Sequence, residues 1–449
     1  MRKVRVLLYI MLLLLAATIA YVLFGSSSDA VSVTYKIRID DPTDGTLTVS
    51  MNVRPSGFMF SDLYLKDSVL NDIPRTYEFS ARRGRFPLAS WQAIPGFADV
   101  RRVWTGFSRA PFEITYTIDP NWFLGTVPRS FLGTDFAYLR GMVFLYTPVG
   151  SNTLLAALRR TNPVAPSGYA DLYFALPEGW SVNSPYGDTP KAINFSDLRD
   201  VYFGLGQLAP EQVDVLDTSL WVGVLSSLPE EQQALIRRQI PLLFAEAASL
   251  TGFMPQSKAA YWAVSVFRER PIHGGATGIN SVVCGAALPT VAQYIFNWWN
   301  GEALKSTADA LWIEHGFATY YAAKLLYLTD AWSKEQFELH LEELERAVFS
   351  EEDAYAVDLT HASLRLASGH HTQDDYDAVY YIGALLAAYL DQRLEQQSTS
   401  LDRIWARLYA HRLPFSTDVF LHRLEEIGGN TLRSECEQIV RGLKPLTPD

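Results

Sequence analysis

The stretch LWIEHGFATYY, residues 311–321, lies in a segment whose apolar spacing predicts a helix over 305–328. It places a tryptophan, a carboxylate, an imidazole and a glycine within five consecutive positions. A second stretch, AQYIFNWWNG at 292–301, belongs to a helix predicted over 290–300, and eighteen residues separate Phe296 from His315. The interpretation of the whole chain depends on what these two helices can and cannot do chemically.

Two further stretches of the sequence are combined with the first two. The loop GGATGINS at 274–281 follows a strand predicted over 261–267, and its paired glycines are typical of a turn. The stretch VYYIGALL at 379–386 lies in a helix predicted over 375–396. Both are candidates to lie near the first two stretches in the folded chain.

Histidine and cysteine usage limits the metal chemistry that is open to the chain. It has eight histidines, and no two of them lie four residues apart, so the His-x-x-x-His helix pair of zinc peptidases is absent. Two cysteines, Cys284 and Cys436, exclude a disulfide scaffold and every multi-cysteine metal site. Whether these two cysteines pair with each other stays open, because the sequence does not place their Cα atoms.

Length and charge narrow the class of protein further. A chain of 449 residues is long enough for two or three domains, each with its own core. The formal net charge of −11 disfavours a nucleic-acid partner, because phosphate binding needs clustered lysine and arginine. We therefore expect a globular chain without a nucleic-acid partner.

The N-terminal segment predicts a membrane anchor. Residues 6–24 carry no charge and follow a basic cluster of Arg2, Lys3 and Arg5. The basic side is expected to stay in the cytoplasm, which places residues 31–449 on the periplasmic side of a single-pass inner-membrane protein. A cleaved signal peptide is the alternative, with small residues at 28–30 as its cleavage site.

Hydropathy patterning divides the rest of the chain. Alternating apolar and polar residues recur from 31 to about 215 and predict an antiparallel β domain, beginning with a hairpin of 31–39 and 47–53. From 216 to 335 a helix–strand–helix pattern indicates a second domain, and 336–449 is predicted to be helical. The fold class expected is α+β, with 1–30 as anchor and linker.

The four stretches resemble, in order, the landmarks of the gluzincin aminopeptidases, that is, the glycyl aminopeptidase-like and membrane alanine aminopeptidase-like families. Residues 311–321 resemble the helix written Trp-x-x-Glu-Gly-Phe-x-x-Tyr-Tyr, and His315 stands where that family has its third zinc ligand. Residues 292–296 resemble His-Glu-x-x-His, so that Ala292 and Phe296 stand at the two histidine positions and Gln293 at the general base. The resemblance implies an N-terminal β domain followed by a thermolysin-like, mainly helical peptidase module.

The other two stretches extend the resemblance. The loop at 274–281 resembles the family's Gly-Gly-Leu-Glu loop, which holds the substrate amine, and Thr277 stands in place of the glutamate. The stretch at 379–386 resembles the Tyr-x-Lys-Gly-Ala helix. Tyr380 then stands where the family has a transition-state-stabilising tyrosine, and Ile382 replaces the lysine.

The residues at these positions do not support zinc peptidase chemistry. A catalytic zinc needs three N, O or S donors, and methyl and phenyl groups at 292 and 296 supply none. The amide of Gln293 cannot take a proton from water, and Thr277 has no charge to hold a substrate ammonium. We therefore expect neither a catalytic residue nor a metal ligand, and no zinc cofactor although the family uses one.

The function predicted from the sequence is that of a membrane-anchored, extracytoplasmic, catalytically inactive aminopeptidase homologue that binds peptides or a protein partner. One alternative is a working hydrolase with a metal site rebuilt around His315, together with Glu314 or the His370–His371 pair. Another is an envelope scaffold. The residues expected to line the former cleft are Thr277, Ala292, Gln293, Phe296, Glu314, His315 and Tyr380.

Overall fold

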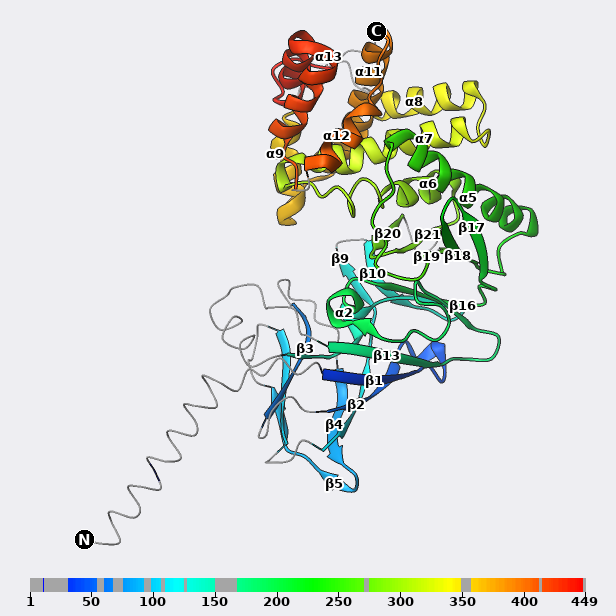
Figure 1. The fold of residues 1–449 in the computed structure, drawn as a ribbon, viewed down its shortest axis with the longest axis vertical. Helices are drawn as coiled ribbons and strands as arrows, with labels where there is room; N and C mark the ends of the chain where they lie inside the picture. The colour runs from blue at the N-terminus through cyan, green and yellow to red at the C-terminus, as the bar shows by residue number, and fades with distance from the viewer. Residues whose placement is uncertain are drawn as a thin grey trace. The chain divides into compact units, whose positions relative to one another are not determined.

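The structure is a computed structural model of the chain. It describes Met11 and residues 31–54, 60–67, 76–92, 98–105, 110–124, 127–149, 168–269, 274–348, 357–411 and 414–446. The chain forms two compact units, Met1–Gln207 and Leu208–Asp449 (Figure 1). Each unit is described by itself.

The first unit is built from three sheets. Their strand orders are β15-β13-β1-β2-β8-β4-β5, β14-β16-β11-β10-β9 and β12-β3-β7-β6. The strands are β1 Val31–Arg38, β2 Leu47–Val53, β3 Phe60–Asp67, β4 Thr76–Arg83, β5 Phe86–Pro87, β6 Ser90–Gln92, β7 Ala98–Trp104, β8 Phe112–Ile118, β9 Trp122–Leu124, β10 Val127–Leu132, β11 Phe136–Arg140, β12 Thr147–Val149, β13 Gly168–Ala175, β14 Ser181–Asn183, β15 Ile193–Asn194 and β16 Tyr202–Gly206. Short helical turns are η1 Pro42–Asp44, α2 Gly141–Phe144 and α4 Phe195–Leu198.

The alternating pattern of the sequence is visible in the burial of the largest sheet. Val33, Tyr35 and Ile37 of β1 are fully buried, and β2 pairs with β1 in the antiparallel register of the predicted hairpin. The expectation of an antiparallel domain holds for most of its pairs but is wrong for β1 and β13, which run parallel from Val31 opposite Gly168. Alternation in a sequence reports which face is buried, and it carries no information on strand direction.

The second unit contains one five-stranded sheet, in the order β17-β18-β19-β21-β20. Its strands are β17 Glu211–Val215, β18 Thr218–Val224, β19 Trp262–Phe267, β20 Gly275–Gly278 and β21 Ser281–Gly285. β18, β19 and β21 are parallel, and α5 (Glu230–Thr251) connects the first two. The sequence suggested a boundary near 215, whereas β17 pairs with β18 in this sheet.

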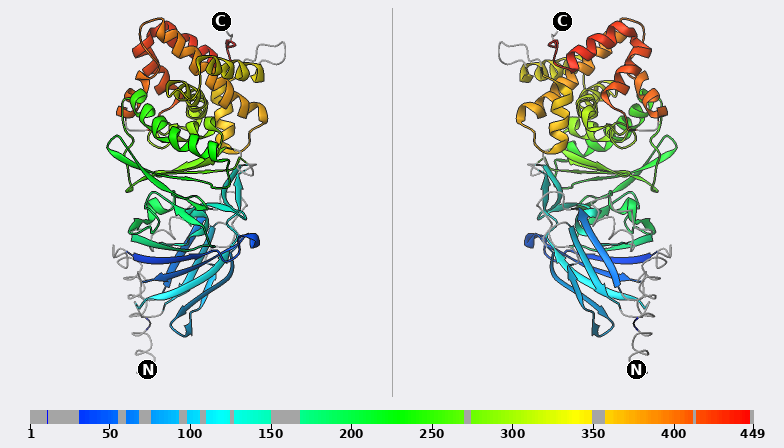
Figure 2. Two further views of the ribbon diagram at one scale, coloured as in Figure 1. Left: turned by 90° about the vertical axis from the view of Figure 1, so that its right-hand side faces the viewer. Right: turned by 90° about the vertical axis from the view of Figure 1, so that its left-hand side faces the viewer.

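Helices make up the rest of the second unit and gather on one face of its sheet (Figure 2). They are α6 Leu288–Phe296, the short η2 Ala308–Ala310, the π-helix η3 Trp312–Phe317, α7 Ala318–Leu328, α8 Lys334–Val348, α9 Leu359–Ser368, α10 Gln373–Asp377, the π-helix η4 Ala378–Ile382, α11 Gly383–Glu395, α12 Arg403–His411 and α13 Thr417–Val440. An α+β fold with an antiparallel-rich N-terminal part and a helical C-terminal part is thus confirmed.

Three features differ from the expected helix pattern. Helix α9 lies in the region 336–449 that was predicted to be helical but was not distinguished there, and the helix expected over 305–328 begins as the separate turns η2 and η3. Helix α13, the last of the predicted helical region, is broken at Gly429, whose φ of 80° no right-handed helix contains. Cys284 and Cys436 are both buried and are not paired with each other.

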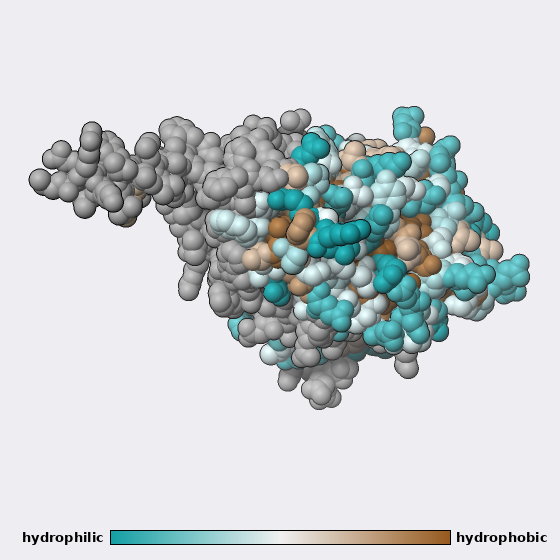
Figure 3. All heavy atoms as spheres, turned by 90° about the horizontal axis from the view of Figure 1, so that it is seen from below, coloured by the Kyte–Doolittle hydropathy of each residue, from teal (hydrophilic) through white to brown (hydrophobic). Residues whose placement is uncertain are grey.

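The surface carries both hydrophobic and hydrophilic residues. On the face drawn in Figure 3, hydrophobic residues occur among hydrophilic ones within the described part of the chain. No helix among the described residues is long and apolar enough to cross a membrane. The anchor predicted at 6–24 lies outside those residues, apart from Met11.

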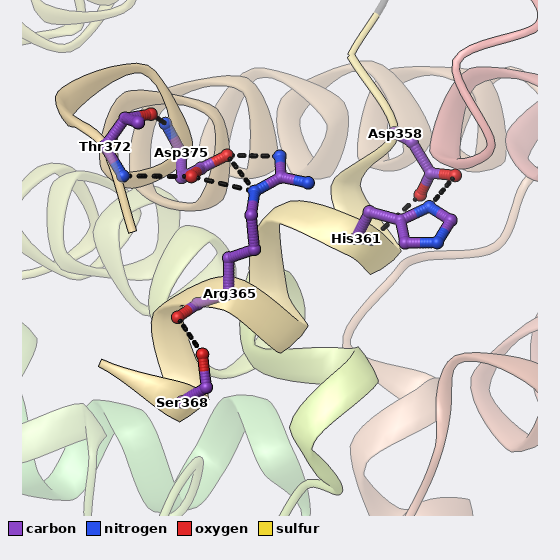
Figure 4. A network of polar contacts seen from close by, with 6 residues as sticks. All are labelled: Asp358, His361, Arg365, Ser368, Thr372 and Asp375. Atoms are coloured by element: carbon purple, nitrogen blue, oxygen red, sulfur yellow. Dashed lines mark hydrogen bonds and ion pairs between the residues drawn. The ribbon is translucent and has the colours of Figure 1, made fainter. Parts of the chain in front are cut away.

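An ion pair joins α9 to the start of α10 (Figure 4). Arg365 Nε lies 3.0 and 2.9 Å from the two carboxylate oxygens of Asp375, which also accepts a hydrogen bond from the backbone N–H of Thr372 at 3.0 Å. Thr372 Oγ1 in turn accepts from the N–H of Asp375 at 3.2 Å, which closes a capping box. The arrangement fixes the loop that carries His370 and His371.

Stability should fall on acidification because of this carboxylate. The hydrogen bond from Arg365 lowers the pKa of Asp375 from 3.8 to about 2. A lowered pKa means that the folded state favours the ionised form, so the stabilisation is complete above 3.8 and is lost as the pH falls through about 2. Urea unfolding should show Asp375→Asn less stable than the wild type at pH 7, with the difference shrinking below pH 4. Asp374→Asn, at an exposed neighbour, should show no such trend.

Candidate functional site

Three of the four stretches singled out in the sequence meet at α6, and the fourth packs on η3. On one side, Thr277 of β20 donates from Oγ1 to the carbonyl oxygen of Tyr294 in α6, at 3.3 Å. On another side, Gln293 donates from Nε2 to Thr319 Oγ1 at 3.3 Å, and Thr319 in turn donates to the carbonyl oxygen of His315 at 3.0 Å. The structure therefore brings β20, α6 and η3 into one cluster.

The π-helix η3 crosses the junction of η4 and α11 at a pair of glycines, Gly316 of η3 and Gly383 of α11. A Cβ at Gly316 would lie 2.6 Å from the Gly383 carbonyl carbon, and a Cβ at Gly383 would lie 2.7 Å from the Trp312 carbonyl oxygen. Only glycine allows two backbones to approach this closely. Because η3 carries His315 and η4 carries Tyr380, this crossing sets the distance between those two side chains.

We expect Gly316→Ala to destabilise the second unit by about 1–3 kcal/mol, because the added methyl meets backbone atoms that cannot rotate away. In an uncrowded helix the same substitution would stabilise by up to about 1 kcal/mol, so the sign of the effect is the test. The measurement is the free energy of unfolding in urea. An unchanged or higher stability would show that the close crossing does not exist.

An aromatic stack results from this crossing. The His315 and Tyr380 rings stack at a centroid distance of 4.8 Å and an interplanar angle of 4°, and Tyr376 stacks on Tyr380 at 4.2 Å and 18°. Burial raises the pKa of the Tyr376 hydroxyl above its usual value, with Tyr381 and Asp377 adding to the rise. Tyr376 was not singled out in the sequence, although it lies one helical turn before Tyr380. Single-turn π-helices are frequent at functional sites, which makes this stack the centre of the candidate site.

The two positions where the gluzincin pattern has histidine are parts of the apolar core. Ala292 and Phe296 are both fully buried. The Phe296 ring stacks on Tyr321 at 4.7 Å with an interplanar angle of 5°, and it meets Trp405 edge-on at 5.7 Å. Neither side chain has a lone pair, and the volume next to Phe296 is filled by other rings. The residues present do not fit a zinc ion at this place.

The side chains of Glu314 and His315 contact different neighbours. Ser306 donates from Oγ to Glu314 Oε2, and a Cβ at Gly301 would lie 3.5 Å from Glu314 Oε1. His315 instead stacks on Tyr380 of η4. The carboxylate and the imidazole therefore do not converge on one point, as two ligands of the same metal ion must.

A metal site rebuilt from other residues finds no support in the described structure. Among the described residues there is no group of three or more His, Cys, Asp or Glu side chains that could hold a metal ion. His370 and His371 are exposed in the loop between α9 and α10. The alternative of a working hydrolase with a rebuilt metal centre thus lacks a donor set in this part of the chain.

A buried ion network that includes Tyr321, the stacking partner of Phe296, was not predicted from the sequence. Lys324 of α7 lies 2.7 Å from Asp391 Oδ2 and 2.9 Å from Asp402 Oδ1. Tyr320 donates to Asp391 at 2.6 Å, and Tyr321, which stacks on Phe296, donates to Asp402 at 2.8 Å. A lysine in an otherwise apolar run, AAKLLYL, is the only signal of it.

The charges of this network depend on one another. Burial alone would lower the pKa of Lys324, but the two carboxylates outweigh it and raise the pKa above its usual value. Burial, Asp391 and Asp402 all raise the pKa of the Tyr320 and Tyr321 hydroxyls, which stay protonated and act as donors. The network keeps the ammonium charged and fixes the hydroxyl of Tyr321, whose ring stacks on Phe296.

Comparison with known proteins identifies the fold. No family profile matches the chain, and no curated protein is significantly similar to it in sequence. An aminopeptidase N family protein from Idiomarina loihiensis superposes with a TM-score of 0.72 at 17% identity, covering 92% of this chain and 77% of that one. The M1 zinc metallopeptidase from Deinococcus radiodurans superposes with a TM-score of 0.55 at 12% identity, covering 94% and 96%. A variant of the latter bound to a Tyr-Ser-Ala substrate gives 0.55 at 13%.

At these identities the likeness establishes the fold. The chain has the architecture of the two-domain M1 metallopeptidases. This is the gluzincin aminopeptidase fold that the four stretches predicted.

Proposed function

We propose that residues 208–449 form a peptidase-like module that binds an extended peptide segment and does not hydrolyse it. The observation that carries this proposal is the packing of Phe296. Where the family pattern has a zinc-ligating histidine, a buried phenyl ring stacks on Tyr321. The module has the fold of the M1 metallopeptidases. At the position where the family pattern has a metal ligand, its core is filled by an apolar side chain.

The neighbouring groups support the absence of hydrolysis. Gln293 stands at the general-base position, and its amide donates to Thr319 instead of accepting a proton from water. Tyr380 stacks between His315 and Tyr376, and an oxyanion donor has no reaction to assist without a nucleophile. These residues could still contact a bound peptide.

The edge strand β20 supports peptide binding. It is the last strand of its sheet in the described part of the chain, and it pairs with β21 on one side. Gly285 donates to the carbonyl oxygen of Gly274, so the alternation of antiparallel pairing directs the N–H and C=O of Gly275 and Thr277 away from β21. An extended peptide could add to this edge as a further strand.

The N-terminal segment completes the proposal. We propose that residues 6–24 anchor the protein in the inner membrane, with the peptidase-like module on the extracytoplasmic side. The uncharged run and the basic cluster before it support this orientation. Membrane fractionation and protease accessibility of the full chain would test it.

Peptide binding can be tested with Tyr-Ser-Ala and its N-acetylated form, using calorimetry for binding and mass spectrometry for cleavage. Both forms should bind and stay intact, because Thr277 carries no charge that would select a free amine. Thr277→Pro should weaken binding about tenfold or more by removing the outward N–H, whereas Thr277→Val, which keeps it, should not.

Two results would contradict the proposal. Release of free tyrosine from the unmodified peptide, abolished by His315→Ala, would mean that the module is an active aminopeptidase. Absence of binding by either peptide would favour the scaffold alternative.

A further inference from the structure

The second unit contains a cavity of about 650 Å³ that involves none of the seven candidate positions. Its wall includes the loop after α5 with Gln256 and Lys258, the segment after α6 with Glu302 and Lys305, and Tyr409 of α12. Its volume lies within the range of sites for small organic ligands. It is therefore a second place in the fold where a ligand could bind.

The loop that carries Lys258 is held in place by a buried asparagine. Asn280, in the turn between β20 and β21, is 4% exposed and also lines the cavity. Its Oδ1 accepts from the backbone N–H of Lys258 at 3.0 Å, and its Nδ2 donates to Ser257 Oγ at 2.7 Å. A fixed loop reduces the cost of ordering the wall when a ligand binds.

The charge around the cavity favours an anion. Lys258 and Lys305 are exposed and make no ion pair with any carboxylate in the described part of the chain. Glu302 contributes one negative charge, which leaves an excess of one positive charge along the wall. Leu304 and Leu408 supply apolar surface behind these groups.

We propose that this cavity binds a small organic carboxylate with an apolar body. The two lysine ammonium groups hold the carboxylate, and the apolar body lies against Leu408 and the ring of Tyr409. The ring of Tyr409 is itself fixed by stacking on Phe253 at 4.0 Å with an interplanar angle of 9°. This site is independent of the peptide edge on β20, so either one can fail without the other.

Three probes that share one body and differ in charge test the proposal: 4-phenylbutyrate, 4-phenylbutanol and 4-phenylbutylamine. Titration calorimetry on the full chain should show saturable binding of the carboxylate, with the alcohol and the amine weaker by about tenfold or more. The double variant Lys258→Ala/Lys305→Ala should weaken carboxylate binding by a similar factor. Tryptophan fluorescence should change on binding, because Trp262 and Trp298 form part of the wall.

The control is Lys191→Ala/Lys334→Ala, which removes the same charge from exposed positions outside the cavity and should leave binding unchanged. Three results would overturn the proposal: no saturable binding of the carboxylate, binding of the amine that equals or exceeds it, or equal loss of binding in the control variant.

Discussion

Replacing Lys324 by methionine should destabilise the second unit by about 3–5 kcal/mol, because it removes the cation from a buried network that contains two carboxylates. The Lys324 side chain is 12% exposed and that of Asp391 3%. Without the ammonium, Asp391 and Asp402 would face each other with only hydroxyl and backbone donors. The free energy of unfolding in urea and hydrogen exchange along α7 would measure the loss.

Two further variants make this prediction specific. Lys334→Met removes a lysine that is 68% exposed and pairs with Glu338 one turn along α8, so it should change stability by less than about 1 kcal/mol. Adding Asp391→Asn to Lys324→Met should recover part of the loss, because the two sites are in contact and their effects are not additive. A Lys324→Met protein as stable as the wild type would show that the network contributes no net stabilisation.

Replacing Phe296 by alanine should cost about 3–5 kcal/mol. The ring is fully buried between Tyr321 and Trp405, so its removal leaves a cavity next to the ion network. Phe296→His, which restores the family's ligand type, should also destabilise the second unit, because an imidazole buried among these aromatic rings would lose its hydrogen bonds to water. Urea unfolding measures both variants.

The exposed Phe86 offers the matched control. It is 77% exposed, so Phe86→Ala should change stability by less than about 0.5 kcal/mol. If Phe296→Ala behaved like this control, position 296 would be a tolerant lining position and not part of the core. The argument against a metal site would then lose its main support.

Much of the fold could be predicted from local patterns. The strands of the first sheet follow the alternation of apolar residues, and α5 begins after Pro229 with two glutamates and ends at Gly252 in the left-handed conformation. The parallel pairing of β1 with β13 could not be predicted, because it joins segments more than 130 residues apart, and only the closed sheet determines it. Within 336–449, which was predicted to be helical, α9 was not distinguished as a helix of its own, although Asp358 caps its start and Gly369 ends it.

The candidate site was predicted in part. The four stretches were recognised by the spacing of Trp, Gly and Tyr residues, and the structure brings three of them together at α6 and packs the fourth on η3. The orientation of the side chains in these stretches depends on the two π-helices η3 and η4. No sequence pattern predicts a π-helix. The separation of Glu314 from His315 and the network around Lys324 arise from contacts between helices that are distant in the sequence.

The measurement that tests the account most directly is the zinc content of the purified full chain after exposure to excess zinc and dialysis, taken together with aminopeptidase turnover. The account predicts no stoichiometric zinc and no turnover, because Ala292 and Phe296 supply no donors and Phe296 fills the space with its ring. One zinc per chain, lost together with turnover in His315→Ala, would contradict it.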